Sequence, residues 1–117
     1  MTENVRVQAI IEWLAEKKAE NVKFYDVQKV SSYTDMIIVC EGNADLHVRA
    51  IANYLISAAK EYHLKLISKE GLEFSHWVLL DFGDIVVHIF LPQTRLFYRI
   101  DELFMNQIAK TQEESTL

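Results

Sequence analysis

The run VLLDFGDIVVHIF, residues 78–90, constrains the fold of this chain more than any other stretch. Two short apolar segments flank Asp-Phe-Gly-Asp, and Gly83 can adopt the positive φ that a tight reversal of the chain needs. The run therefore predicts a hairpin of two buried strands, HWVLLDF and DIVVHIF. Asp81, Asp84 and His88 are unusual inside such strands. Four interpretations of them are open: a catalytic cluster, a metal site, a turn with a structural histidine, or part of a docking face.

Apolar spacing predicts the other elements. VRVQAIIEWLAEKK has helical periodicity behind Thr2 as its cap, and GNADLHVRAIANYLISAAKEYH has the clearest apolar stripe, with Asn43 as its cap. VKFYDVQKV, DMIIVCEG and LKLISKEG are predicted to be strands. After Pro92 ends the last strand, TRLFYRIDELFMNQ is expected to form one or two short helical turns and TQEESTL to fray.

The predicted order is helix, two strands, helix, three strands, helix, which contains too few βαβ units for a doubly wound parallel sheet. We expect a single α/β (α+β) domain with a mixed sheet of about five strands and at least one antiparallel edge. The helices should pack mainly on one face of the sheet, so that part of the other face stays exposed. Residues 1–108 are predicted to be the domain and residues 109–117 a polar C-terminal tail.

Side chains alternate between the two faces of a strand, so the segment HWVLLDF presents two different surfaces. The uniformly apolar surface is the expected core and consists of Val78, Leu80 and Phe82. The opposite surface has the composition of a recognition surface and consists of Trp77, Leu79 and Asp81. A structural interpretation fits the composition equally well, with Trp77 in the core and Asp81 at the start of the turn.

The charge of the chain indicates the class of partner. Its 17 acidic and 12 basic residues give a formal net charge of −5, and the basic residues are dispersed. Direct grip on a phosphate backbone usually needs a basic patch, so little nucleic-acid contact is expected. An acidic chain suits a basic partner, such as a protein that itself binds nucleic acid.

The location of the protein is indicated by its cysteine count and its apolar runs. Cys40 is the lone cysteine and lies in an apolar segment, which indicates a reducing compartment and an inert, packed thiol. No signal peptide is expected, and no apolar run reaches the roughly 18–20 residues that span a bilayer. We therefore expect a soluble, cytoplasmic protein with no membrane contact.

The motifs of common enzymes are missing, so no catalytic residue, cofactor or metal is expected. A metal site needs three or four suitably spaced ligands, and the sequence has no CxxC, HxxxH or HExxH pattern. GxSxG, P-loop and GxGxxG motifs are also absent. Asp84 follows Gly83 and is expected to belong to the turn. His88 and Asp81 could meet across the hairpin, where the carboxylate would fix the imidazole tautomer.

Three blocks of the sequence resemble the ribosomal silencing factor family, also known as the Iojap family. The blocks are TDMIIVCEGNADLHVRAIA at 34–52, EG followed by WVLLDFGDIVVHIF at 70–90, and RLFYRIDELF at 95–104. The match is collinear from the first helix to about residue 104, and the second block is long and specific. The chain departs from the family pattern at Glu41, His47, Arg99 and Phe104.

The resemblance implies a function in translation. Members of the family bind the large ribosomal subunit through ribosomal protein uL14 (protein fourteen of that subunit), which lies on the subunit-joining surface. Their presence there sterically prevents the small subunit from docking, which represses translation when nutrients are scarce or in stationary phase. The implied fold is similar to that of nucleotidyltransferases, but this chain lacks the paired carboxylates that hold two metal ions in those enzymes. The resemblance therefore implies a non-enzymatic scaffold.

The hairpin pattern and the resemblance together give an expected site. The side chains expected to contact the partner protein are Trp77, Leu79, Asp81, Tyr98 and Leu103. The residues expected to support this surface are Gly83, Asp84, His88 and Arg95. Trp77 would be the buried anchor, and Asp81 would steer and orient a basic partner.

Three alternatives stay open at this point. The chain could assist assembly of the large subunit by acting at the same site. It could be a degenerate nucleotidyltransferase or small hydrolase that uses Asp35, Asp81, Asp84 and His88. It could also self-associate into a homodimer through an apolar sheet face, which could coexist with ribosome binding by hiding the same surface.

Overall fold

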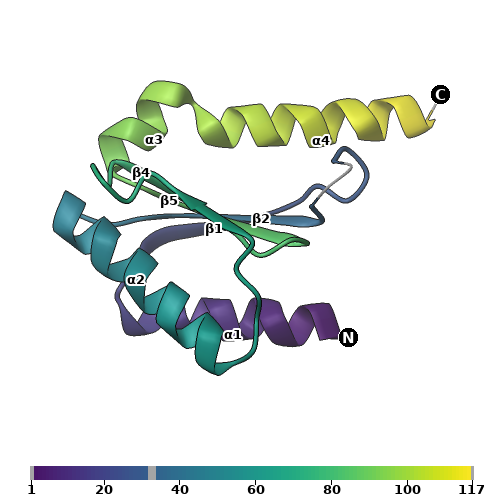
Figure 1. Ribbon diagram of the computed structural model, residues 1–117. Coiled ribbons are helices and arrows are strands. Elements are labelled where there is room, and N and C mark those ends of the chain that lie inside the picture. The colour runs from purple at the N-terminus through teal and green to yellow at the C-terminus, as the bar shows by residue number, and fades with distance from the viewer. Residues whose placement is uncertain (1, 32–33, 117) are drawn as a thin grey trace.

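The computed structural model describes residues 2–31 and 34–116, and within them one mixed sheet has helices on both faces (Figure 1). The strands are β1 (Glu20–Asp26), β2 (Met36–Glu41), β3 (Ser68–Glu70), β4 (Trp77–Asp81) and β5 (Ile85–Phe90). They lie in the order β1-β2-β5-β4-β3. Only β2 and β5 pair in parallel, whereas both edge strands, β1 and β3, pair antiparallel to their neighbours. The predicted α/β domain with a mixed five-stranded sheet is confirmed.

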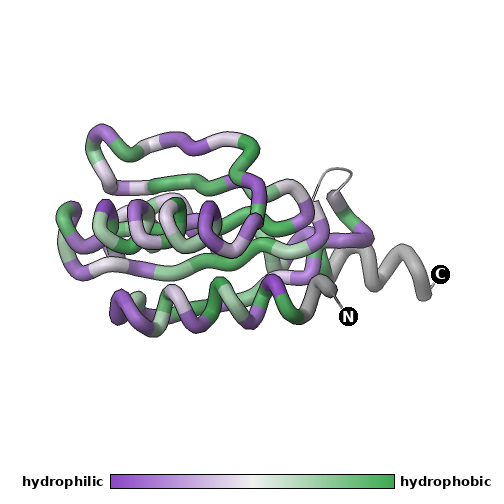
Figure 2. Tube along the Cα trace, turned by 60° about the horizontal axis from the view of Figure 1, so that its bottom comes forward, coloured by the Kyte–Doolittle hydropathy of each residue, from purple (hydrophilic) through white to green (hydrophobic). Residues whose placement is uncertain are grey.

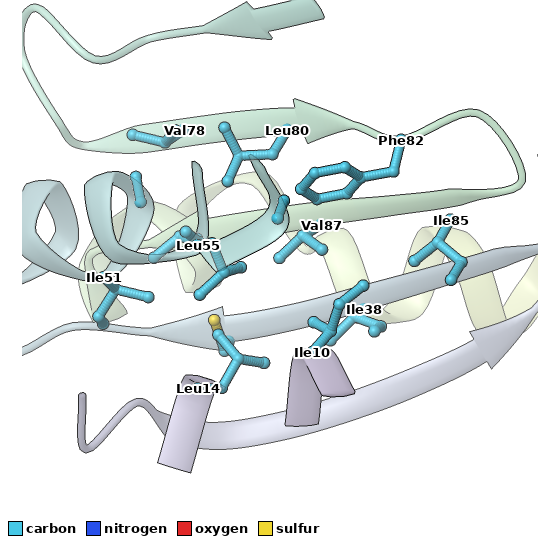
Figure 3. Close-up of a cluster of buried hydrophobic side chains, with 14 of the residues drawn as sticks. Ile10, Leu14, Ile38, Ile51, Leu55, Val78, Leu80, Phe82, Ile85 and Val87 are labelled. Atoms are coloured by element: carbon cyan, nitrogen blue, oxygen red, sulfur yellow. The ribbon is translucent and has the colours of Figure 1, made fainter. Parts of the chain in front are cut away.

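The first core lies between the sheet and the two helices α1 (Thr2–Glu16) and α2 (Asp45–Glu61), and Figure 3 shows part of it. The predicted inward side chains are fully or almost fully buried here, where they pack with residues of β5 and of both helices. They are Val78 and Leu80 of β4, and Phe82 just after it. Apolar and polar residues are interspersed along α2 (Figure 2). The apolar residues that recur on its buried face are Val48, Ile51, Ala52, Leu55 and Ala59. Cys40 is buried in this core, and burial raises the pKa of its thiol to about 12. The thiol is therefore protonated and unreactive in the folded protein.

The opposite face of the sheet is covered by the C-terminal part of the chain (Figure 1). After the short helix α3 (Pro92–Tyr98), the chain forms α4 (Ile100–Thr116). The prediction of one or two short turns in this segment was wrong. Ile100, Phe104 and Ile108 recur at helical spacing and pack against the sheet, which gives α4 an apolar stripe of its own. The face expected to stay partly exposed is thus largely covered, while the division at residues 108 and 109 stays a prediction.

The start of α2 differs from the prediction. Its N-cap residue is Ala44, with no side-chain cap, so the predicted Asn43 cap was wrong. Gly42, the last residue of the predicted strand, still pairs with β5, since its amide donates to the carbonyl of Phe90, at 3.0 Å. The amide of Asn43 donates instead to Nδ1 of His47, at 2.9 Å. His47 therefore helps to close the junction between strand and helix.

Candidate functional site

The predicted contact residues of β4 share the sheet face that looks toward α4. In the antiparallel hairpin Trp77 pairs with Phe90, Leu79 with His88, and Asp81 with Val86. Paired residues on neighbouring strands place their side chains on the same face. All six side chains therefore lie on one face, and a second core forms there; it contains Tyr25, Val27, Ile37, Val39, Phe90 and Ile100, with Val30, Trp77, Phe104 and Ile108 packed against them.

Trp77 is half-buried and is held in place from three sides. Its indole Nε1–H donates a hydrogen bond to Nδ1 of His88, at 3.0 Å. Its ring centroid lies 4.9 Å from that of Phe90 and 5.3 Å from that of Tyr98. The structural interpretation holds in that Trp77 packs against the second core, and its side chain still reaches solvent. Its contact with a partner stays a prediction. An aromatic side chain whose orientation is already fixed loses little entropy on binding a partner.

His88 is buried and neutral. Burial lowers the pKa of its imidazole from 6.5 to about 4. Because Nδ1 accepts the indole proton of Trp77, the single proton of the neutral ring is assigned to Nε2. The predicted pairing of His88 with Asp81 was wrong: Oδ1 of Asp81 accepts the amide proton of Gly83, at 2.8 Å. The carboxylate thus closes a turn of its own.

This geometry predicts that the folded protein loses stability as the pH falls from about 6.5 to about 4. The pKa of His88 is near 6.5 in the unfolded chain and about 4 in the folded chain, so in this window the unfolded state binds more protons. The contribution is fully present above pH 6.5 and declines on acidification, by up to about 3 kcal/mol. Urea unfolding of the wild type and of His88→Gln at pH 7.5 and pH 4.5 measures the effect. Equal losses of stability in the two proteins would contradict the prediction.

Gly83 and Asp84 fix the turn of the hairpin. Gly83 has φ +94°, a conformation that glycine adopts without strain, and the amide of Phe82 donates to the carbonyl of Ile85 across the turn, at 2.9 Å. The carbonyl of Asp84 accepts the amides of both Asp35 and Met36, each at 3.0 Å. The carboxylate of Asp84 forms an ion pair with Arg6. The turn is therefore tied both to the start of β2 and to α1.

Arg95 joins the C-terminal helices to the other edge of the sheet. Its Nε and Nη2 donate to the two carboxylate oxygens of Asp101, at 2.7 and 2.8 Å. Its Nη1 donates to the carbonyl of Asn21, at 2.7 Å, and to Oε2 of Glu41, at 3.1 Å. The Nδ2 of Asn21 in turn donates to Oε1 of Glu41. Glu41 is therefore the second carboxylate partner of a buried guanidinium.

The charges of this cluster are mutually stabilised. The bidentate bond from Arg95 is the main reason why the pKa of Asp101 falls to about 2. Tyr25 donates its hydroxyl proton to the same carboxylate. Burial, followed by this hydrogen bond, raises the pKa of Tyr25 to about 12. α3 and α4 are thereby fixed relative to β1 and β2 by charged and polar contacts as well as by packing.

An exposed apolar surface lies on α3 beside Trp77. Leu96 and Phe97 are 79% and 78% exposed, and Tyr98 is about half exposed. The predicted contact residue Leu103 is also half exposed but lies on α4. The ring centroids of Phe97 and Tyr98 are 5.0 Å apart. Trp77, Phe97 and Tyr98 thus form a continuous aromatic patch. Leu96 and Phe97 were not among the predicted contact residues. A helix cannot bury three adjacent side chains on one stripe, so the consecutive Leu-Phe-Tyr could have indicated exposed apolar side chains.

Leu79 and Asp81 do not belong to this patch but open into a groove of about 400 Å³. The groove lies on the sheet beneath α4; it is lined by Val27, Val30, Ser31, Thr34, Ile37, Leu79, Asp81, Val86, His88, Phe104 and Gln107. The residues predicted to contact a partner are therefore divided between two adjoining surfaces, the aromatic patch and the groove.

Neither a metal centre nor a membrane-spanning segment is found in the described part of the chain. No group of three or more histidine, cysteine or carboxylate side chains is arranged there to hold a metal ion. None of the described helices is long and apolar enough to cross a bilayer. Within the same residues, every fully buried polar side-chain atom has a hydrogen-bond partner.

Comparison with known proteins finds relatives both by sequence and by structure. The sequence model of a family described as "Ribosomal silencing factor during starvation" matches residues 2–117. The "Ribosomal silencing factor RsfS" of Halalkalibacterium halodurans is 34% identical over 104 residues, which cover 89% of each chain. A crystal structure of a Chromobacterium violaceum protein is similar with a TM-score of 0.81 and 35% identity, covering 84% of this chain and 82% of the other. The mouse "Mitochondrial assembly of ribosomal large subunit protein 1" is 29% identical, over 93% of this chain and 51% of its own length.

Proposed function

The chain belongs to the ribosomal silencing factor family, and on that premise we propose that it binds the large ribosomal subunit through ribosomal protein uL14. Bound there, it sterically prevents the small subunit from joining and so represses translation when nutrients are scarce. It performs no catalysis, takes no cofactor and acts in the cytoplasm, where the ribosomes are. The observation that carries this proposal is the aromatic patch, in which half-buried Trp77 is fixed beside exposed aromatic side chains.

The aromatic patch has the properties of an interface hot spot. Such sites are rich in tryptophan and tyrosine and lie where a partner can exclude water completely. Trp77 is held by His88 and Phe90, while Phe97 and Tyr98 remain exposed enough to be covered. A surface that is both exposed and rigid binds without a large ordering cost. Leu103, half exposed at the start of α4, extends the patch, and Arg95, one turn before Tyr98, fixes its orientation.

Electrostatics favours a basic protein over RNA as the main contact. The formal net charge is −5, and Asp81 faces the groove next to the patch. Carboxylates at an interface accelerate encounter with a positively charged partner and reject a negatively charged one. A ribosomal protein meets this requirement, whereas the ribosomal RNA backbone does not.

A second function is favoured by one of the relatives. The name of the mouse protein describes assembly of the large ribosomal subunit. We therefore keep, as a second proposal, that the chain assists assembly of the large subunit by acting at the same site. Self-association into a homodimer through the aromatic patch is compatible with either role, because it would hide the surface until a ribosomal partner competes for it.

Sedimentation with separated ribosomal subunits tests the main proposal. Added protein is expected to migrate with the large subunit alone, because only that subunit carries uL14. When both subunits are present, the fraction of joined ribosomes should fall in proportion to the protein bound. Co-migration with the small subunit, or full joining in the presence of saturating bound protein, would contradict the proposal. If added protein leaves subunit joining normal, and cells that lack the protein accumulate defective large subunits, the role in assembly is favoured.

A further inference from the structure

The groove beneath α4 is lined by apolar and polar side chains, and Asp81 is the one carboxylate among them. Leu79, Ile37 and Val86 form its floor on the sheet, while Val30 and Phe104 line it from the β1–β2 connection and from α4. Its volume of about 400 Å³ lies in the range of pockets that accept small ligands or long side chains, about 300–1,000 Å³. A cleft of this kind, with a mostly apolar lining and a few fixed polar groups, can bind one extended group in a single orientation.

The charge in the groove has no counterpart among its described walls. Asp81 is the one acidic side chain of the lining, and no lysine or arginine is among the lining residues. His88 adds no positive charge, because its buried imidazole is neutral near pH 7. The carboxylate is also held in position, since its Oδ1 accepts the amide of Gly83 at 2.8 Å. A fixed negative charge beside the apolar side chains of this groove is complementary to a cation on an apolar stem.

We propose that this groove receives one basic side chain, a lysine or an arginine, from the ribosomal protein on which the chain docks. The inference rests on the proposed function and adds to it the chemistry of a specific partner residue. Lysine and arginine carry their charge at the end of an aliphatic stem, which can lie on apolar surface while the charged head stays on a carboxylate. The stem packs between Leu79 and Phe104, and the head pairs with Asp81. The groove adjoins the aromatic patch, so both surfaces meet the same partner.

Dissociation kinetics separates this insertion from simple attraction between charges. A carboxylate that only steers a partner changes the association rate, whereas one that holds an inserted charge changes the dissociation rate. Asp81→Asn removes the charge and keeps an oxygen for the Gly83 amide. Asp26→Asn is a matched control, because Oδ1 of Asp26 accepts the amide of Gln28 in the same way and Asp26 does not line the groove. Val30→Phe fills the groove without changing any charge.

The experiment measures dissociation from purified large ribosomal subunits at fixed ionic strength. Asp81→Asn is expected to dissociate about tenfold faster than the wild type, the size expected for a lost hydrogen bond to a charged group. Val30→Phe should also dissociate faster, and Asp26→Asn should keep the wild-type rate. If wild-type protein binds but Asp81→Asn and Val30→Phe both dissociate at the wild-type rate, the insertion is wrong and the proposed function stands. If wild-type protein does not bind at all, both the insertion and the proposed function are wrong.

Discussion

Replacing Trp77 by alanine is expected to weaken binding to the large ribosomal subunit by about 2–4 kcal/mol, or roughly 30- to 700-fold in the dissociation constant. The indole connects the aromatic patch to the second core, because its ring lies between those of Tyr98 and Phe90. Its removal takes away the ring contacts with Phe90 and Tyr98 and leaves Nδ1 of His88 without its donor. Equilibrium binding of labelled protein to purified large subunits measures the loss.

Trp13 offers a matched control for this substitution. It lies on α1, on the other side of the sheet, where its ring packs edge-on against Tyr62 with centroids 5.7 Å apart. Trp13→Ala deletes the same side chain from a partly buried site, so it is expected to lower stability but to leave binding near the wild-type value. A folded Trp77→Ala that binds as tightly as the wild type would remove Trp77 from the interface. Equal losses of binding in both variants would indicate a general effect of lower stability.

Replacing Arg95 by methionine is expected to lower the free energy of unfolding by about 3 kcal/mol or more. Removal of one member of a buried ion pair leaves its partners without compensation, which typically costs about 3–5 kcal/mol. Here Glu41 is buried and Asp101 partly buried, and both depend on the guanidinium. The exposed fraction of Asp101 reduces its share, so the lower end of the range is expected. Urea unfolding at pH 7 measures the change.

Arg6→Met provides the comparison for Arg95→Met. Arg6 also pairs with a carboxylate, that of Asp84, but both side chains are close to one-third exposed. A pair of this kind contributes about 0–1 kcal/mol, so Arg6→Met should change stability by less than 1 kcal/mol. Similar losses in the two variants would show that the buried cluster contributes no more to the free energy of unfolding than the more exposed ion pair does.

The acid limb of stability gives a second readout for the Arg95 cluster. The pKa of Asp101 is about 2 in the folded protein, below its ordinary value of 3.8, so its contribution is present above about pH 4 and is lost as the pH falls toward 2. Since Arg95 is the main cause of this low pKa, the loss of stability between pH 4 and pH 2 should be smaller in Arg95→Met than in the wild type. An unchanged acid limb would contradict the assignment of the low pKa to Arg95.

Local sequence patterns predicted the hairpin and the first core correctly. Alternation along β4 separates a buried set led by Leu80 from a half-buried set led by Trp77, because a strand has a strict period of two residues. The stripe of α2 was predicted equally well for Ile51 and Leu55, since helical spacing depends on the sequence alone. Tyr62, at the end of the predicted helical segment, is 44% exposed, because it lies at the C-cap, where α2 ends.

The contacts of the second core depend on positions far apart in the chain, and the sequence did not reveal them. The hydrogen bond from Trp77 to His88 follows from the register of β4 and β5, and register cannot be read from composition. Arg95 meets Glu41 and Asn21 only once α3 has packed beside β1 and β2. α4 was underestimated because its apolar residues, Ile100 and Phe104 among them, end near residue 108 and are followed by an almost wholly polar stretch. Such a stripe stabilises a long helix only when it can pack against a sheet face.

The covering of this sheet face by α4 also changes what the site can be. The sequence suggested a flat, open surface formed by Trp77, Leu79 and Asp81. In the structure the aromatic patch lies at α3, and the groove lies under α4. The contact residues predicted from the sequence remain proposals, but a partner would meet them on two adjoining surfaces, the aromatic patch and the groove.

The central claim is that this protein occupies the uL14 surface and physically separates the two ribosomal subunits. Cryo-electron microscopy of the protein bound to the large subunit tests it most directly. The map is expected to show the aromatic patch against uL14, with the body of the protein overlapping the volume that the small subunit would fill. Density for the protein away from the joining surface, with the small subunit free to dock, would contradict the claim.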